Sequence, residues 1–221
     1  MTRGLRAVAA ALLLLLGAAT AGTADEGAAG DWLGKVSRKY GAVRSLSARF
    51  RQEVPLARVG VVRKAQGRVW FERPLRMRWE YERPPDQLFL ADGRHFWFRP
   101  SGSDRVFKSP IDERAAGGRV PLLLLFGRGQ LGEFFRAEEA IPRAGGAEMA
   151  LRLVPRDGGA GEVRRVDLVV DATTLAVREI HLYDRLGGSN HLYLQDLAID
   201  PPIGEGFFRY VPIPGTEVVE G

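Results

Sequence analysis

The feature that most constrains the fold is an alternating stretch between Gly67 and Pro100. From Leu75 to Tyr81, every second residue is bulky and apolar, and the residues between them are charged. A period of two is typical of a strand with one dry face and one wet face. Turns at 84–86 and at Asp92-Gly93 each lead into another apolar run, and Asp-Gly is a strong hairpin signal. The stretch predicts an antiparallel meander, and we expect its apolar face to line a cavity for acyl chains.

Further strands are predicted on both sides of this meander, with Gly67 as a bulge or bend. They are the ranges 45–54, 59–71, 105–108, 149–153, 163–170, 175–183, 191–199 and 207–211. Hairpin-length connections cannot make the crossovers that parallel strands need. The chain is therefore predicted to be mainly β, with a single curved antiparallel sheet of about eleven strands forming an incomplete β-barrel. We expect one domain, residues 25–221.

Two short helical regions are expected to interrupt the strands. Asp31 is a plausible N-cap for a helix of about three turns that carries Trp32, Val36, Tyr40 and Val43 on one face. In the middle of the chain, Pro121 begins a dense leucine block that ends before Gly127, and 130–135 is a second helical segment. A short helix is favoured for the block because β-branched residues are scarce, and a buried strand is the alternative.

Residues 1–24 are predicted to be a cleaved signal peptide. Arg3 and Arg6 precede an apolar run from Ala7 to Leu16, and small residues follow it. Without Arg3 and Arg6, 30 basic and 27 acidic residues remain, a net charge of only +3. There is no cysteine, so we expect neither disulfides nor an acylated N-terminal cysteine. The expected location is the periplasm, as a soluble monomer.

No catalytic constellation is visible in the sequence. Of the three histidines, His181 and His191 flank one hairpin and could face each other, whereas His95 stands apart. A pair of histidines without a carboxylate pattern is a weak metal signal, and nucleophile elbows and zinc-protease motifs are missing. Acidic and basic residues are interleaved, which disfavours a nucleic-acid surface. We expect no enzyme activity, no cofactor, no metal and no nucleic-acid partner.

An ordered set of short motifs resembles the LolA family of periplasmic outer-membrane lipoprotein carriers. The motifs cover nearly all of the chain after residue 24. They are Ala48-Arg-Phe-Arg-Gln52, Gly67-Arg-Val-Trp70, Arg73-Pro74 followed by Met77, Trp79 and Tyr81, Pro84-x-Asp86-Gln87, Asp92-Gly93, Pro121 to Phe126, Leu153-x-Pro155, and Phe207-x-Arg-Tyr-Val-Pro212.

The resemblance implies a half-barrel lidded by short helices that carries acylated lipoproteins. The cargo would come from an inner-membrane ABC-type releasing complex and pass to an outer-membrane receptor. In the family, the arginine of the Arg-Pro pair holds the lid closed, and Arg73 occupies that position. The alternatives are a carrier of free lipid or glycolipid on the same fold, and a periplasmic lipid-sensing regulatory domain.

The candidate site residues fall into three groups. The acyl-chain cavity is assigned to Phe50, Trp70, Leu75, Met77, Trp79, Tyr81, Leu88 and Leu90. The lid is assigned to Leu122, Leu123, Leu124, Leu125 and Phe126. The lid gate is assigned to Arg73.

Overall fold

The computed structural model describes residues 21–56, 59–111, 131–156 and 163–221. The elements are α1 (Ala21–Ala42), β1 (Ser45–Leu56), β2 (Val61–Glu72), β3 (Arg76–Arg83), β4 (Leu88–Asp92), β5 (His95–Arg99), β6 (Arg105–Pro110), α4 (Leu131–Phe134), β7 (Phe135–Arg143), η1 (Ala144–Gly146), β8 (Glu148–Pro155), β9 (Val163–Asp171), β10 (Val177–Asp184), β11 (Ser189–Ile199) and β12 (Glu217–Glu220). Within these residues, no helix is long and apolar enough to cross a membrane.

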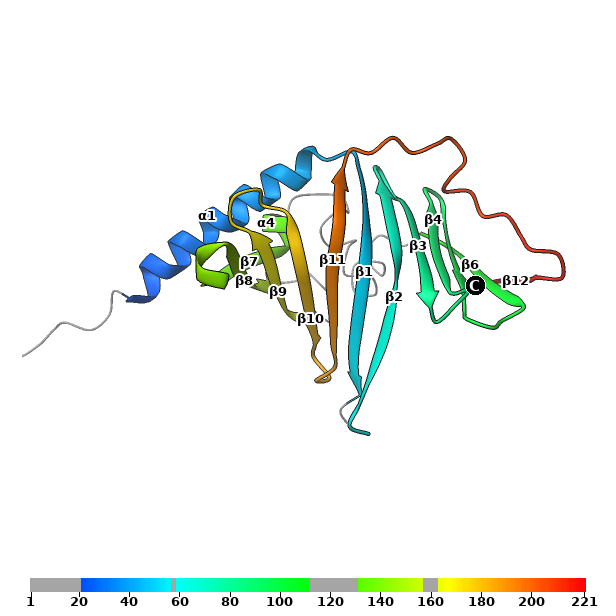
Figure 1. Ribbon diagram of the computed structural model, residues 1–221, viewed down its shortest axis with the longest axis horizontal. Coiled ribbons are helices and arrows are strands. Elements are labelled where there is room, and N and C mark those ends of the chain that lie inside the picture. Colours follow the sequence, from blue (N-terminus) through cyan, green and yellow to red (C-terminus); the bar gives the residue numbers. More distant parts are fainter. Residues whose placement is uncertain (1–20, 57–58, 112–130, 157–162) are drawn as a thin grey trace, which may run out of the picture.

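All the described strands belong to one curved, open sheet (Figure 1). The order is β12-β6-β5-β4-β3-β2-β1-β11-β10-β9-β8-β7, so β7 and β12 form its two edges. β1 is central because it pairs with its hairpin neighbour β2 on one side and with the late strand β11 on the other. The predicted fold class, a mainly β chain built on one open curved sheet, is confirmed.

The alternation in β3 determines which side chains face the core. Met77 and Trp79 are 0% and 2% exposed, whereas Arg76 between the turn and Met77 is exposed. Val69 and Phe71 of β2 stand opposite Trp79 and Met77 and are buried with them. We call the face that carries these side chains the inner face, because it shares one core with α1.

Gly67 lies at a bulge between β2 and β3, as the sequence predicted. The register shifts between Gln66 and Gly67, and a Cβ atom at Gly67 would lie 1.9 Å from the backbone oxygen of Glu80. No side chain fits at that distance, so the close approach of the two strands requires glycine.

The helix α1 covers one half of the sheet. Its buried residues Ala29, Leu33, Val36 and Tyr40 recur every three or four positions, as expected of an amphipathic helix. The helix packs against β7 and β8, and Figure 1 shows it running along the β7–β10 side of the molecule. Asp31 was predicted as its N-cap. That prediction is wrong, because the helix begins at Ala21 and Asp31 lies on its exposed side.

The predicted strands at the two edges of the sheet and the helix before β7 also need correction. The segment 207–211 forms turns and coil rather than a strand, and β7, which was not predicted, supplies a strand at the opposite edge. The last strand is β12, and it pairs with β6 in parallel rather than antiparallel. The connection 200–216 is long enough for such a crossover, which hairpin-length loops would not allow. The helix predicted at 130–135 is α4, and Phe135 already begins β7.

Candidate functional site

A series of aromatic side chains crosses the inner face from β1 to β6, and we call it the aromatic ladder. Its ring centroids are 4.9 Å apart for Phe50 and Trp79, 6.0 Å for Tyr81 and Phe89, and 4.5 Å for Phe89 and Phe98. Cross-strand aromatic pairs at such distances stabilise a sheet beyond the area that they bury. The members are Phe50, Trp79, Tyr81, Phe89, Phe96, Phe98 and Phe107.

The aromatic ladder becomes more exposed toward β6. Phe50 and Trp79 are buried at the centre of the sheet, Phe89, Phe96 and Phe98 are half-buried, and Phe107 is 44% exposed. An exposed apolar surface that continues into a core is a feature of interaction and ligand sites. This part of the inner face therefore offers a continuous apolar track from the surface to the interior.

Several of the predicted cavity residues come together on this face. Phe50, Trp79 and Tyr81 belong to the aromatic ladder, and Met77 lies beside them in the same core. Leu75 is half-buried in the turn that precedes β3. Sequence reasoning missed the outer part of the ladder, Phe89 to Phe107. Alternation does not mark these rings in the sequence, because apolar residues of the outer face, Leu88, Leu90 and Trp97, stand next to them.

The structure places Trp70, Leu88 and Leu90 on the opposite face, which we call the outer face. Trp70 stands opposite Arg78, and Leu90 stands between Arg78 and Trp97. Leu88 and Leu90 form a small second core with Val106 and Tyr210, and the ring of Trp70 packs on Phe207 at 5.1 Å. These three residues cannot line the same cavity as Met77, because the segment after β11 covers them from the other side.

Arg73 is bonded to the C-terminal end of α1. Its Nε donates to the carbonyl oxygen of Val43 at 2.9 Å, and its Nη2 donates to that of Tyr40 at 3.1 Å. A cation bonded to the last carbonyls of a helix also interacts favourably with the helix dipole. The predicted lid residues 122–126 lie outside the described residues, so the gate between Arg73 and that block stays a prediction.

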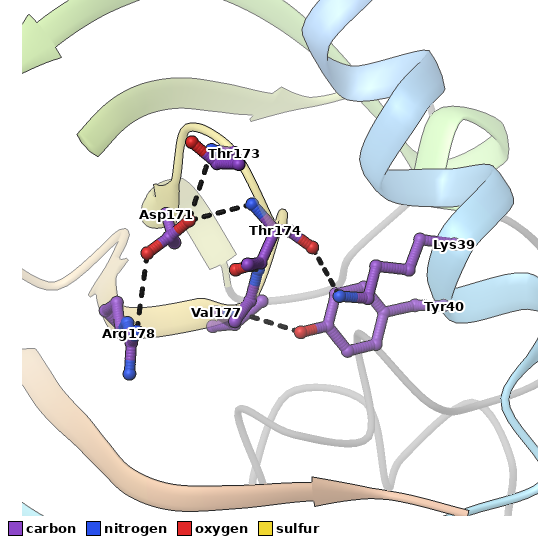
Figure 2. Close-up of polar contacts among 8 residues, drawn as sticks. Lys39, Tyr40, Asp171, Thr173, Thr174, Val177 and Arg178 are labelled. Atoms are coloured by element: carbon purple, nitrogen blue, oxygen red, sulfur yellow. Dashed lines mark hydrogen bonds and ion pairs between the residues drawn. The ribbon is translucent and has the colours of Figure 1, made fainter. Parts of the chain in front are cut away.

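Tyr40 connects the C-terminal end of α1 to the start of β10 as well (Figure 2). Its hydroxyl oxygen accepts a hydrogen bond from the backbone N–H of Val177 at 2.8 Å, at the start of β10. Burial raises the pKa of the Tyr40 phenol to about 12. Lys39 donates to the carbonyl of Thr174 in the preceding turn, where Asp171 accepts from the N–H groups of Thr173 and Thr174. The last turn of α1 thus joins the β2–β3 turn to the β9–β10 turn.

A chain of polar side chains lies next to the buried end of the aromatic ladder. The Tyr81 hydroxyl donates to Gln52 Oε1 at 2.9 Å, and Gln52 Nε2 donates to Asn190 Oδ1 at 2.9 Å. Burial raises the pKa of the Tyr81 phenol, which keeps it protonated as a donor. These three hydrogen-bonded side chains come from β3, β1 and β11 and lie on the inner face.

Asn190 also lines a cavity of about 310 Å³ at the end of the sheet where the β1–β2 and β10–β11 hairpins lie. Five apolar residues form much of its wall: Val54, Pro55, Leu56, Val163 and Leu182. Asp184, Gly188 and Ser189 complete the lining together with Asn190. We call this cavity the hairpin pocket.

The two hairpin histidines lie on the outer face. His181 and His191 are register partners, as the sequence suggested, and their rings stack with centroids 4.5 Å apart. Among the described residues, no group of three or more His, Asp or Glu side chains could hold a metal ion.

The architecture defines the class of the molecule: one open, curved sheet whose inner face is closed by an N-terminal helix on one half and carries an aromatic track on the other. A model of the family described as outer membrane lipoprotein carrier protein LolA matches residues 41–211. The chain belongs to this family, which confirms the resemblance seen in the motifs.

Individual relatives match a shorter part of the chain. An outer-membrane lipoprotein carrier protein of Nitrosomonas europaea is 34% identical over 95 residues, which are 43% of this chain and 45% of that protein. A protein of the same name from Alkalilimnicola ehrlichii is 34% identical over 101 residues, 45% of this chain and 46% of that protein. The chain thus spans about half the length of the relatives that it matches.

The fold is also similar to that of an uncharacterized conserved protein from Thermus thermophilus. The TM-score is 0.54, with 13% sequence identity, and the match covers 86% of this chain and 98% of the other. At this identity the likeness shows the fold alone.

Proposed function

We propose that the protein is a non-enzymatic periplasmic carrier that holds the acyl chains of lipoproteins on its inner face. It would accept them from an inner-membrane ABC-type releasing complex and deliver them to an outer-membrane receptor. The observation that carries the proposal is the aromatic ladder, which leads from the half-exposed rings of β5 and β6 to the buried Trp79. Membership of the family and the names of the two relatives support it.

The described structure corresponds to a closed state in this proposal. Met77 and Trp79 are buried, so an acyl chain can contact them only after the groups that cover them have moved. Arg73 and Tyr40, which hold the last turn of α1 between the two halves of the sheet, would resist that movement. A hydrogen bond to a charged group contributes roughly 1.5–3 kcal/mol, so opening would have a substantial free-energy cost.

Such a cost is useful in a carrier. Each buried methylene contributes roughly 0.8 kcal/mol, and lipoprotein acyl chains contain tens of them. Full burial without any opposing term would exceed the limit of about 20 kcal/mol seen in non-covalent binding, and the cargo would not be released. The free energy spent on opening would lower the net affinity and permit transfer to the receptor.

The tryptophans allow a direct test, because Trp79 lies on the inner face and Trp70 on the outer face. Two single-tryptophan proteins are made by replacing the other three tryptophans with Phe. Each is titrated with a synthetic diacylglyceryl lipopeptide whose acyl chains carry bromine, which quenches indole fluorescence on contact. Quenching is expected for the Trp79 protein and not for the matched Trp70 protein. Equal quenching of both, or none of either, would contradict the proposal.

The cargo itself needs a separate measurement. Mass spectrometry of ligands that co-purify with the protein from the periplasm should detect acylated peptides. Free lipids or glycolipids in their place would support the alternative carrier on the same fold.

A further inference from the structure

The hairpin pocket has the size and composition of a small ligand site. Its volume of about 310 Å³ lies near the lower end of small-molecule pockets, which range from roughly 300 to 1,000 Å³. Val54 and Leu56 of β1 and Leu182 of β10 form apolar parts of the wall. They lie at one end of the inner face, which is also the face that carries Phe50. On this face of β1, Gln52 separates the pocket from Phe50, the buried end of the apolar track of the proposed function.

The two hairpins beside the pocket also expose apolar side chains. Leu56 is 36% exposed, Val61 opposite it is more exposed, and Leu186 at the tip of the β10–β11 hairpin is 93% exposed. Large exposed aliphatic side chains gathered at two neighbouring hairpin tips favour contact with another apolar surface.

One wall of the pocket can donate a hydrogen bond. Asn190 Oδ1 accepts from Gln52 Nε2, and Gln52 Oε1 in turn accepts from the Tyr81 hydroxyl, so the oxygen of the Asn190 amide already has a partner. The remaining group of that amide, its NH₂, is a donor. A carbonyl oxygen placed in the pocket could accept from it.

The charge of the lining disfavours an anionic ligand. None of the nine described residues that line the pocket is basic, and the charged one is Asp184. Its Oδ1 accepts from the backbone N–H groups of Leu186 and Gly188, both at 2.8 Å, which fixes the carboxylate beside the pocket. A free fatty acid or a phosphate head group would meet a like charge there, with no compensating cation among the described lining residues.

We propose that the hairpin pocket binds the ester or amide linkage of an acyl group, with Asn190 as the donor to its carbonyl. The hydrocarbon continues from the pocket along the inner face toward Phe50. This inference rests on the proposed function and adds a chemical selectivity to it: neutral, ester-linked or amide-linked acyl groups bind, and free fatty acids are disfavoured.

The first test fills the pocket from its rim. Leu56→Trp places a large side chain at the lining, whereas Val62→Trp introduces the same side chain on the same hairpin, outside the lining. Binding of a fluorescent diacylglyceryl lipopeptide is measured by anisotropy with the full chain. We expect Leu56→Trp to weaken binding about tenfold and Val62→Trp to change it less than about twofold. Equal effects of the two variants would overturn the inference.

The second test separates recognition of the carbonyl from damage to the fold. Asn190→Leu is compared with the native protein for two lipopeptides of equal chain length, one ester-linked and one with ether linkages that lack the carbonyl. The native protein should prefer the ester by about three- to tenfold, and Asn190→Leu should abolish that preference. A variant that loses affinity for both ligands equally would show a merely structural role and contradict the inference.

The third test concerns charge. Free palmitate should bind the native protein more weakly than the lipopeptide, and Asp184→Asn, which can still accept from the turn, should strengthen palmitate binding alone. If the Trp79 protein is quenched by the brominated lipopeptide but the pocket variants bind normally, the pocket inference fails and the carrier function stands. If the native protein takes up no acyl ligand, both fail.

Discussion

The inner face of the sheet has two halves with different chemistry. Over β8 to β10, the inner residues are aliphatic and fully buried in the core that α1 shares, among them Leu151, Leu168 and Ile180. Over β4 to β6, the large inner residues are aromatic, and Phe89, Phe98 and Phe107 remain partly exposed. We call these the aliphatic half and the aromatic half.

Under the proposed function, this difference would separate stability from binding within one sheet. Aliphatic side chains that interdigitate with a helix make a dense core with little room for anything else. Rings that stack across strands form a broad apolar surface without needing a covering layer, and a flexible hydrocarbon can slide along them. A carrier needs both properties, because its fold must persist while part of its core surface is vacated and refilled.

The largest effect is expected for a core truncation in the aliphatic half. Leu168 is fully buried on β9 between Leu151 and Ile180. Leu168→Ala should lower the free energy of unfolding by about 2–5 kcal/mol, because it removes buried methylenes and leaves a cavity. Urea denaturation measures this loss.

Phe98→Ala is the matched change in the aromatic half. Because Phe98 is already half-exposed, the loss of stability should be only about 1–2 kcal/mol. Lipopeptide affinity should respond in the opposite order, falling for Phe98→Ala and staying near native for Leu168→Ala. If Phe98→Ala proved the more destabilising of the two, the aromatic half would be a closed core and the comparison would fail.

A more local effect than that of Leu168→Ala is expected where the two halves are joined. Arg73→Leu removes the guanidinium bonds to Val43 and Tyr40 and should destabilise the last turn of α1 by about 2 kcal/mol. The variant should fold and take up lipopeptide, but it should pass the lipopeptide on slowly, since less free energy opposes the open state. Transfer to an acceptor is followed by the loss of Trp79 quenching.

Arg76→Leu is the control for this change. Arg76 is exposed, and its ion pair with Glu72 at 2.8 Å lies on the surface, where such pairs contribute little. Hydrogen exchange in the last turn of α1 should speed up in Arg73→Leu and remain native in Arg76→Leu. Native transfer kinetics in Arg73→Leu would remove its role as a gate.

Much of the geometry of β2, β3 and the β4–β5 turn could be predicted from the sequence. The alternation around Met77 and Trp79, the Asp92-Gly93 turn and the bulge at Gly67 are local signals, and each depends on backbone geometry that a few residues determine. In the hairpin from β4 to β5, Asp92 even supplies the acceptor for the N–H groups of Arg94 and His95.

Which face Leu88 and Leu90 occupy could not be predicted in the same way. Leu88, Phe89, Leu90 and Ala91 are all apolar, so period two is lost when both faces of a strand are covered. The cover on the outer face includes Tyr210, more than a hundred positions away in sequence. The hairpin pocket depends likewise on strands distant in sequence, β1 and β11, and on residues that no local pattern relates.

The end of the chain shows a further limit of local patterns. The segment 207–211 is rich in aromatic and β-branched residues, which predicts a strand, yet prolines at 201, 202, 212 and 214 surround it. Proline cannot donate to a sheet ladder, so this segment lies over the outer face instead of extending the sheet. Its rings contribute packing, and the strand forms only afterwards, at β12.

The smallest predicted effect concerns the outer face and its dependence on pH. Burial lowers the pKa of His181, and the neighbouring His191 on β11 lowers it further. Arg143 on β7 acts in the same direction, while Glu179 on β10 and Asp167 on β9 oppose the shift. Because the folded state holds the His181 proton more weakly than the unfolded state does, the unfolded state binds more protons just below the ordinary histidine pKa of about 6.5.

The sign follows from that difference in proton binding. The contribution of His181 to the free energy of unfolding is fully present above about pH 6.5 and is lost as the pH falls through the lowered pKa. Urea denaturation at pH 7.5 and pH 5.5 should therefore show a smaller drop for His181→Gln than for the native protein, and the value at pH 7.5 isolates any packing effect of the substitution. Lipopeptide affinity should not follow this change, because His181 lies on the outer face. An affinity that fell in parallel with stability would mean that the two faces of the sheet are not independent.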